Sequence, residues 1–184
     1  MNLRTVLLFI FAIGILERFI FTLFVRKEKQ GLVRYKWTTY FLISTYICCI
    51  VIILVEFFTL NNELNFIVTS FGACIEVIGI YLRRASVKTI NGFWSKHIKD
   101  IPGQLLIQSG PYALIRHPYY LSVMLELIGW ALFLNSFLAL IFIIFIHFSI
   151  LLVRISLEEK QLSSLFGKKY KQYMIKTNCL LPKI

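Results

Sequence analysis

Long apolar stretches alternate with short polar segments along the whole chain. Five stretches are long enough for a helix to cross a hydrocarbon layer of roughly 30 Å, which takes about 20 residues. They cover residues 3–25, 37–60, 64–82, 118–134 and 136–153. Asn135 and Ser136 alone separate the last two, so we expect a tight helical hairpin there. The pattern predicts an all-α polytopic membrane protein with five transmembrane helices, in one integral membrane domain over residues 1–184.

Composition supports lipid as the main solvent. The chain has 184 residues and is 58% hydrophobic, which is more apolar side chain than one soluble core of this size buries. The formal net charge of +11 would suggest nucleic acid in a soluble protein. Here 18 of the 20 Lys and Arg residues fall in segments 26–36, 83–116 and 154–183. This is where membrane topology places them, so we expect no nucleic-acid partner.

The same charge distribution predicts an orientation. The connections Asn61-Asn62-Glu63 and Asn135-Ser136 contain no basic residue. By the positive-inside rule the three basic segments face the cytoplasm. The N-terminus is then outside and the C-terminus is cytoplasmic, as an odd number of spans requires.

Polar groups inside spans are costly and are candidates for function. Glu17 and Arg18 could pair with neighbouring helices or with Glu76, and Glu56 lies close enough to a span end to reach the interface. Glu126 is eight residues into the fourth span, where it either pairs structurally or contacts substrate or cofactor.

His147, in the fifth span, is better explained as a hydrogen-bonding group between helices than as a metal ligand, because no second His or Cys stands at metal spacing near it. The four cysteines show no metal-like spacing either, and we expect no metal.

A polar segment, residues 104–120, leads into the fourth span. Gly110-Pro111 indicates a turn, and His117 is biased toward extended backbone because Pro118 follows it. Pro118 suits the first turn of a helix. Tyr112, Arg116 and His117 therefore lie just before a helix N-terminus, where free N–H groups could meet a ligand carboxylate. The alternative is an ordinary interfacial anchor.

A second polar segment follows the fifth span. Arg154 and Glu158 are four residues apart and share a helix face with Leu162, Leu165 and Phe166. The charged pair thus points where the apolar stripe points. Gly167 interrupts the helix, and Tyr170 and Tyr173 begin a new amphipathic stretch. The alternative is an interfacial helix that rests on anionic lipid.

Taken together and in order, these motifs resemble the isoprenylcysteine carboxyl methyltransferase family. The resemblance covers roughly residues 97–182 and rests on Gly110-Pro111-Tyr112, Arg116-His117-Pro118 with Tyr120, Arg154 with Glu158-Glu159, Phe166-Gly167 with Tyr170 and Tyr173, and the closing Leu180-Leu181-Pro182. The first three spans match in hydropathy and count alone.

The resemblance implies a cytoplasmic helical cap over a pocket for S-adenosyl-L-methionine. It implies a catalytic role for Arg154, Glu158 and His117, and Arg154 would also hold the substrate. Glu126, from its position inside a span, is a second candidate to bind the substrate. The cofactor would contact Gln104, Leu105, Leu106, Ile107, Tyr112, His117, Pro118, Tyr119, Tyr120 and Glu158, with His97 as the weakest candidate.

The implied reaction is methyl transfer to an oxygen of a lipophilic acceptor that enters from the bilayer. A carboxylate acceptor is already ionised, since its pKa is about 4. A phenol or enol would need a base, and His117 or Glu158 could serve. The acceptor could be isoprenylcysteine-like or another lipid acid or enol, such as an alkylpyrone.

Two other functions fit some of these features. Sterol-reductase-type membrane enzymes that use NADPH resemble this family in their C-terminal helices but have more spans. A non-catalytic membrane scaffold or transport subunit would distribute polar residues along the spans, whereas here they gather at one membrane face. The sequence does not indicate an oligomeric state.

Overall fold

The computed structural model describes residues 2–24, 29–59 and 64–183. The expected span ends at Val25 and Leu60 and the connection at 61–63 lie outside the described residues. The described elements are α1 (Leu3–Phe24), β1 (Leu32–Arg34), α2 (Lys36–Thr59), α3 (Phe66–Ile90), β2 (Ile98–Asp100), α4 (Pro111–Leu114), α5 (Pro118–Phe133), α6 (Phe137–Phe142), the π-helical turn η1 (Ile143–His147), α7 (Phe148–Phe166) and α8 (Lys168–Lys176).

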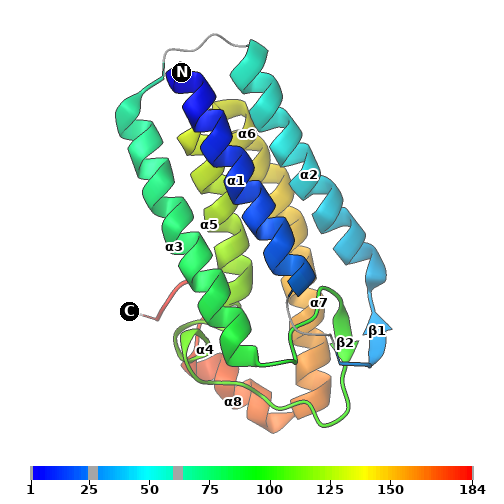
Figure 1. Ribbon diagram of the computed structural model, residues 1–184. Coiled ribbons are helices and arrows are strands. Elements are labelled where there is room, and N and C mark those ends of the chain that lie inside the picture. Colours follow the sequence, from blue (N-terminus) through cyan, green and yellow to red (C-terminus); the bar gives the residue numbers. More distant parts are fainter. Residues whose placement is uncertain (1, 25–28, 60–63, 184) are drawn as a thin grey trace.

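The long helices run side by side as a bundle (Figure 1). Helices α4 and α8 and the strands β1 and β2 gather at one end of the bundle, and the N-terminus lies at the other end. Large apolar side chains are exposed on the outer faces of the helices, for example Phe9, Phe19, Phe41, Phe58 and Phe71. So much exposed apolar surface is foreign to a soluble monomer and suits contact with lipid.

The expectation of five spans is met in part. Helices α1, α2 and α3 and the continuous helix Phe137–Phe166 are long and apolar enough to cross a membrane. Helix α5 is apolar but has 16 residues, fewer than the roughly 20 of a full span. A two-stranded antiparallel sheet pairs Leu32 with Asp100 and Arg34 with Ile98. The expected all-α class therefore needs this small sheet added.

Two boundaries differ from the prediction. Helix α3 was expected to end at Leu82 and continues to Ile90, and the last span was expected to end at Val153 and continues to Phe166. Arg83 and Arg154 are buried inside the bundle, although the hydropathy pattern placed them in polar connections. Each is compatible with a buried helix because oxygen atoms from other helices surround its guanidinium group.

Helices α3 and α5 pack closely through glycine. A Cβ atom on Gly72 would lie 2.4 Å from the backbone N of Phe133. A Cβ atom on Gly129 would lie 2.8 Å from the backbone N of Glu76. Small residues permit such close approach between membrane helices. This contact holds α5, which begins at the candidate site, against the longer helix α3.

The expected hairpin between α5 and α6 is confirmed. Asn135 turns the chain with a φ of 55° and donates from Nδ2 to Thr69 Oγ1 at 2.7 Å. Glu56 lies near the end of α2, as expected, and its side chain is buried against the hairpin. Its carboxylate accepts hydrogen bonds from the Ser136 hydroxyl and from the backbone N–H groups of 137–139. It thus satisfies the free N–H groups at the start of α6.

Candidate active site

A cavity of about 600 Å³ lies between α1, α2, α5, α7 and the segment 93–107. Its lining runs from Tyr170 and Tyr173 of α8 to His147 and Tyr46, further into the bundle. This volume lies within the range of small-molecule sites, roughly 300–1,000 Å³.

The structure brings nearly all the sequence-predicted site residues to this one cavity. Pro118 is buried beside it and Glu126 lies elsewhere in the bundle. The predicted residues that line it are His97, Gln104, Leu105, Leu106, Ile107, Tyr112, His117, Tyr119, Tyr120, Arg154 and Glu158.

The backbone before α5 is irregular, as predicted. Ile115 is extended, and the segment pairs with the C-terminal residues: Arg116 N–H donates to the Asn178 carbonyl and His117 N–H to the Cys179 carbonyl. These two N–H groups are therefore occupied by the C-terminal segment. Pro118 begins α5, and no side chain caps this helix start.

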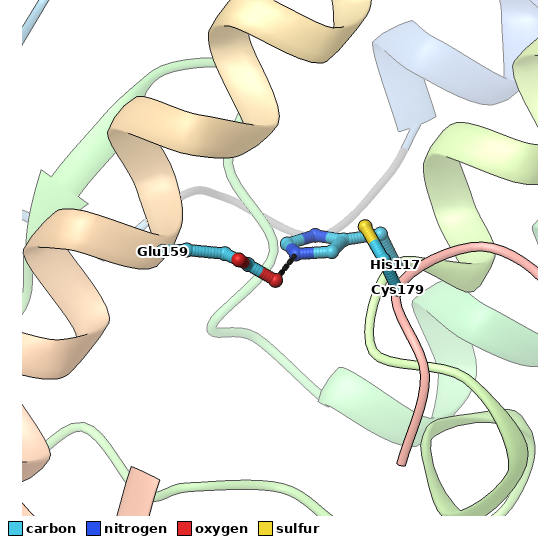
Figure 2. Close-up of side chains that lie close together, drawn as sticks. All are labelled: His117, Glu159 and Cys179. Carbon is cyan, nitrogen blue, oxygen red and sulfur yellow. Dashed lines mark hydrogen bonds and ion pairs between the residues drawn. The ribbon is translucent and has the colours of Figure 1, made fainter. Parts of the chain in front are cut away.

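Glu159 holds His117 and Arg116 in place. The carboxylate Oε1 lies 2.8 Å from Arg116 Nε and 3.1 Å from His117 Nε2 (Figure 2). Arg116 also donates to the Thr177 carbonyl. The C-terminal segment, α5 and α7 are thus tied together at His117, one of the predicted site residues.

Cys179 lies beside this pair (Figure 2), and its Sγ, a nitrogen of His117 and an oxygen of Glu159 are within 4.8 Å of one another. The sequence predicted no metal, because the cysteines and His147 show no metal-like spacing, and these three residues are far apart in the chain. The guanidinium of Arg116 already neutralises the Glu159 carboxylate at 2.7 Å. A divalent cation would therefore meet a positive charge at this place.

Arg154 is 3% exposed and is surrounded by neutral oxygen atoms. Nε donates to the Tyr120 hydroxyl at 2.8 Å, and Nη1 donates to Thr38 and Thr39 Oγ1, each at 2.9 Å. Nη2 donates to the Lys96 carbonyl at 2.6 Å. Within the described ranges, no carboxylate lies at ion-pair distance from this cation.

Tyr120 links Arg154 to Glu158. Its hydroxyl donates to Glu158 Oε2 at 2.5 Å while accepting from Arg154. Its ring stacks on the His117 ring, with centroids 5.6 Å apart and an interplanar angle of 22°. The three residues predicted to be catalytic are therefore connected through one tyrosine.

Helix α8 closes one side of the cavity with buried tyrosines. Tyr173 donates its hydroxyl to the Tyr112 carbonyl at 2.5 Å. Burial raises the pKa of Tyr173 to about 12, and burial also raises the pKa values of Tyr112 and Tyr170. These phenols stay neutral hydrogen-bonding groups at physiological pH. Both tyrosines of α8 are buried against the bundle, so this helix packs over the cavity as a cap. Its lysines lie on the opposite, exposed side.

Buried polar atoms without a partner concentrate at the cavity. Seven such side-chain atoms occur in the described part of the chain, and five belong to residues that line the cavity: Trp94 Nε1, Gln104 Oε1, Tyr170 hydroxyl, Tyr46 hydroxyl and His147 Nε2. Native interiors leave few polar atoms unpaired, and each such atom calls for an explanation such as a bound ligand or water.

Glu126, a predicted substrate contact, is engaged elsewhere. It is 1% exposed, pairs with Arg18, and accepts from Arg83 Nε at 2.9 Å. Arg83 in turn lies 2.5 Å from Glu17. The structural pairing left open by the sequence is thus present, and it joins α1, α3 and α5. Arg18 and Glu17 do not pair with Glu76.

Sequence reasoning missed the partners of Arg154. Thr38 and Thr39 lie in the first turn of α2, and their hydroxyls accept hydrogen bonds from the guanidinium. Two adjacent threonines at the start of an apolar helix could have been noted as candidate polar contacts. The sequence does not show that their partner lies more than 100 positions away.

A bundle of long apolar helices with a cavity that is lined mainly by apolar side chains and carries the polar groups of the candidate site defines the class as a helical membrane protein with a small-molecule pocket. Residues 72–164 match the model of the isoprenylcysteine carboxyl methyltransferase (ICMT) family. The chain belongs to this family.

Two relatives are similar to this chain in sequence. The chain is 30% identical over 116 residues to the protein-S-isoprenylcysteine O-methyltransferase of Saccharomyces cerevisiae, covering 62% of this chain and 48% of the relative. It is 25% identical over 136 residues to the uncharacterized protein YpbQ of Bacillus subtilis, covering 73% and 80%. The chain spans about half the length of the yeast relative.

A solved structure shows the same fold. The eukaryotic intramembrane Ras methyltransferase ICMT superposes with a TM-score of 0.64 at 22% sequence identity. The match covers 77% of this chain and 52% of that one.

Proposed function

We propose that this chain is a membrane-embedded O-methyltransferase that uses S-adenosyl-L-methionine and a lipophilic acceptor. The observation that carries the proposal is the gathering of unpartnered polar atoms around the cavity lined by the predicted site residues. Family membership and the name of the yeast relative support the same reaction class.

The residues at the cap end fit the proposed methyl donor. Gln104 offers a buried carbonyl oxygen, Tyr170 a hydroxyl group and Trp94 an indole N–H without protein partners. These suit the amino, carboxylate and ribose groups of such a ligand. Aromatic faces and the Glu158 carboxylate favour a cationic centre. When bound, S-adenosylmethionine supplies an electrophilic methyl group for an oxygen nucleophile.

Arg154 is suited to hold the acceptor. It is a buried cation whose protein partners are neutral, and a buried charge is unfavourable without an opposite one. Nε and Nη1 have all their protons engaged by protein oxygens, and Nη2 has one. The remaining N–H of Nη2 can meet a carboxylate and leave the second carboxylate oxygen free to attack. Orientation of this kind can contribute up to about 7–11 kcal/mol.

For an enol acceptor, His117 is the better-placed base. Glu159 accepts from Nε2, which leaves Nδ1 of the neutral ring to take a proton. Glu158 already accepts from the Tyr120 hydroxyl. We propose an isoprenylcysteine-like acid or another lipid acid or enol, such as an alkylpyrone, as the acceptor.

We propose the orientation that the basic segments indicate, with α8 and the cavity mouth at the cytoplasmic face. In this arrangement α5 completes five membrane segments, and the Asn135 turn lies on the outer side. Burial of Arg83 and Arg154 removes two charges from the basic segments and leaves the asymmetry in place.

The test is binding of S-adenosylmethionine against NADPH to the purified chain in detergent, read as thermal stabilisation. At one hundred times its Kd, S-adenosylmethionine should add about 2.7 kcal/mol of stability, and NADPH should add none. Glu158→Ala and His117→Ala should weaken this effect, whereas Lys160→Ala, on the exposed face of α7, should not. Absence of stabilisation by S-adenosylmethionine would sink the proposal. A radiolabelled methyl donor with lipid extract then identifies the acceptor.

A further inference from the structure

Helix α2 exchanges polar contacts with the continuous helix Phe137–Phe166 at two levels. At the Arg154 level, Arg154 donates to Thr38 and Thr39. At the His147 level, His147 Nδ1 lies 2.8 Å from Thr45 Oγ1, and the His147 and Tyr46 ring centroids are 6.5 Å apart. The levels are seven residues apart on both helices, which corresponds to about 10 Å along the helix axis.

The Thr45 hydroxyl occupies Nδ1 of the His147 ring. It lies 2.8 Å from His147 Nδ1, and it is also within hydrogen-bond distance of the Phe41 and Leu42 carbonyls, at 3.0 and 3.2 Å. A hydroxyl group can donate to Nδ1 or accept from it, so this contact suits either tautomer of a neutral ring. In both tautomers the other ring nitrogen, Nε2, is left for a second partner.

His147 Nε2 and a neighbouring hydroxyl group have no protein partner. His147 Nε2 and the Tyr46 hydroxyl are both buried without a hydrogen bond in the described part of the chain, and both residues line the cavity. Arg18 does not fill the gap, because it pairs with Glu126 and packs 4.9 Å from the centre of the Tyr46 ring. A buried polar atom that makes no hydrogen bond destabilises the fold.

The backbone also singles out this position. The π-helical turn η1 ends at His147, within an otherwise α-helical segment. Single π turns inside α-helices are rare and frequently lie at functional sites. The helix continues toward α8 with further side chains on the same face that line the cavity: Leu151, Arg154 and Glu158.

We propose that the His147 level is a second polar subsite, about 10 Å along the helix axis from the Arg154 level, and that it binds a hydroxyl group on the acceptor. This rests on the proposed function. A hydroxyl group suits these unpartnered atoms, since it can both donate and accept a hydrogen bond. A plain hydrocarbon chain leaves both unsatisfied. The acceptor class is thus a lipophilic acid that carries a hydroxyl group partway along its apolar chain.

The test compares two probes: a long-chain fatty acid hydroxylated about 10 Å from its carboxylate, and the unsubstituted parent. Binding to the full chain in detergent is measured by displacement of a fluorescent fatty acid, without methyl donor. The hydroxylated probe should bind about tenfold more tightly. His147→Leu and Tyr46→Phe should each remove most of this preference while retaining affinity for the parent. Ser149→Ala, on the exposed face of α7, should keep the preference.

Equal binding of the two probes by the unmodified chain overturns the subsite, as does a preference that survives both substitutions. Tyr46→Phe removes one oxygen atom and decides the matter if His147→Leu does not fold. Methyl transfer from radiolabelled S-adenosylmethionine is scored separately. A hydroxyl preference without methyl transfer contradicts the proposed function alone, and methyl transfer without the preference contradicts the subsite alone.

Discussion

Single buried charges in this chain depend on partners from distant helices. Glu126 of α5 joins Arg18 of α1 and Arg83 of α3. In a medium without water these charges have no alternative source of stabilisation. A residue that looked like a ligand contact from its position in a span therefore connects three helices.

Replacing Glu126 should lower the free energy of unfolding of the bundle and should not act directly on the methyl-transfer step. Glu126→Gln leaves Arg18 without its carboxylate partner and leaves Arg83 with Glu17 alone, and breaking a buried pair costs about 3–5 kcal/mol. Denaturant unfolding in detergent micelles measures this loss. The control Glu17→Gln, at a side chain 28% exposed, should cost less. A Glu126→Gln protein of normal stability that no longer binds the acceptor would return Glu126 to the substrate site.

At the scale of elements, close packing and capping decide where helices lie. The glycines between α3 and α5 bring the two backbones together, and Glu56 fixes the start of α6. Helix α5 has 16 residues, fewer than the roughly 20 of a full span, so its apolar length alone does not set its position in the membrane. Its contact with α3 therefore determines where His117 and Tyr120, at its beginning, stand in the cavity.

Enlarging one glycine should separate α3 from α5. In Gly72→Ala the new methyl group would meet the backbone at Phe133, which cannot rotate away as a side chain can. Overpacking of this kind costs typically about 1–3 kcal/mol, and thermal unfolding in detergent should show it. Val77→Ala, on the exposed face of α3, is the matched control and should change stability little. Equal stability of the two variants would contradict the close approach.

For the whole molecule, the decisive property is that the predicted site residues gather around one cavity toward one end of an apolar bundle. The cap of α4, α8 and the small sheet surrounds this end (Figure 1). Asp100 ties the cap together, since it accepts from Arg34 and from Gln161, each at 2.5 Å. The cavity then runs from this polar cap into the part of the bundle that faces lipid, which suits two ligands of different solubility.

Cysteine labelling tests the proposed orientation. In a variant without native cysteines, Asn2→Cys should react with a membrane-impermeant maleimide from outside intact cells. Lys171→Cys, on the exposed face of α8, should react after the membrane is opened. The expectation follows from the placement of Lys and Arg. The reverse labelling pattern would place α8 and the cavity mouth on the outer side.

The sequence by itself determined the features that depend on neighbours in the chain. Apolar length predicted the helices, the proline and glycine pattern predicted the irregular segment before α5, and the spacing of Arg154 and Glu158 predicted their shared face. The motifs that resemble the family then located the residues of one cavity.

The tertiary structure alone decided which groups meet across helices: Glu126 with Arg18 and Arg83, Glu56 with the start of α6, and Arg154 with Thr38 and Thr39. The physical reason is that hydropathy describes how well a helix suits lipid and says little about its rotation and height beside a neighbour. Side-chain packing sets those two quantities, and they determine which polar atoms are paired and which remain for a ligand.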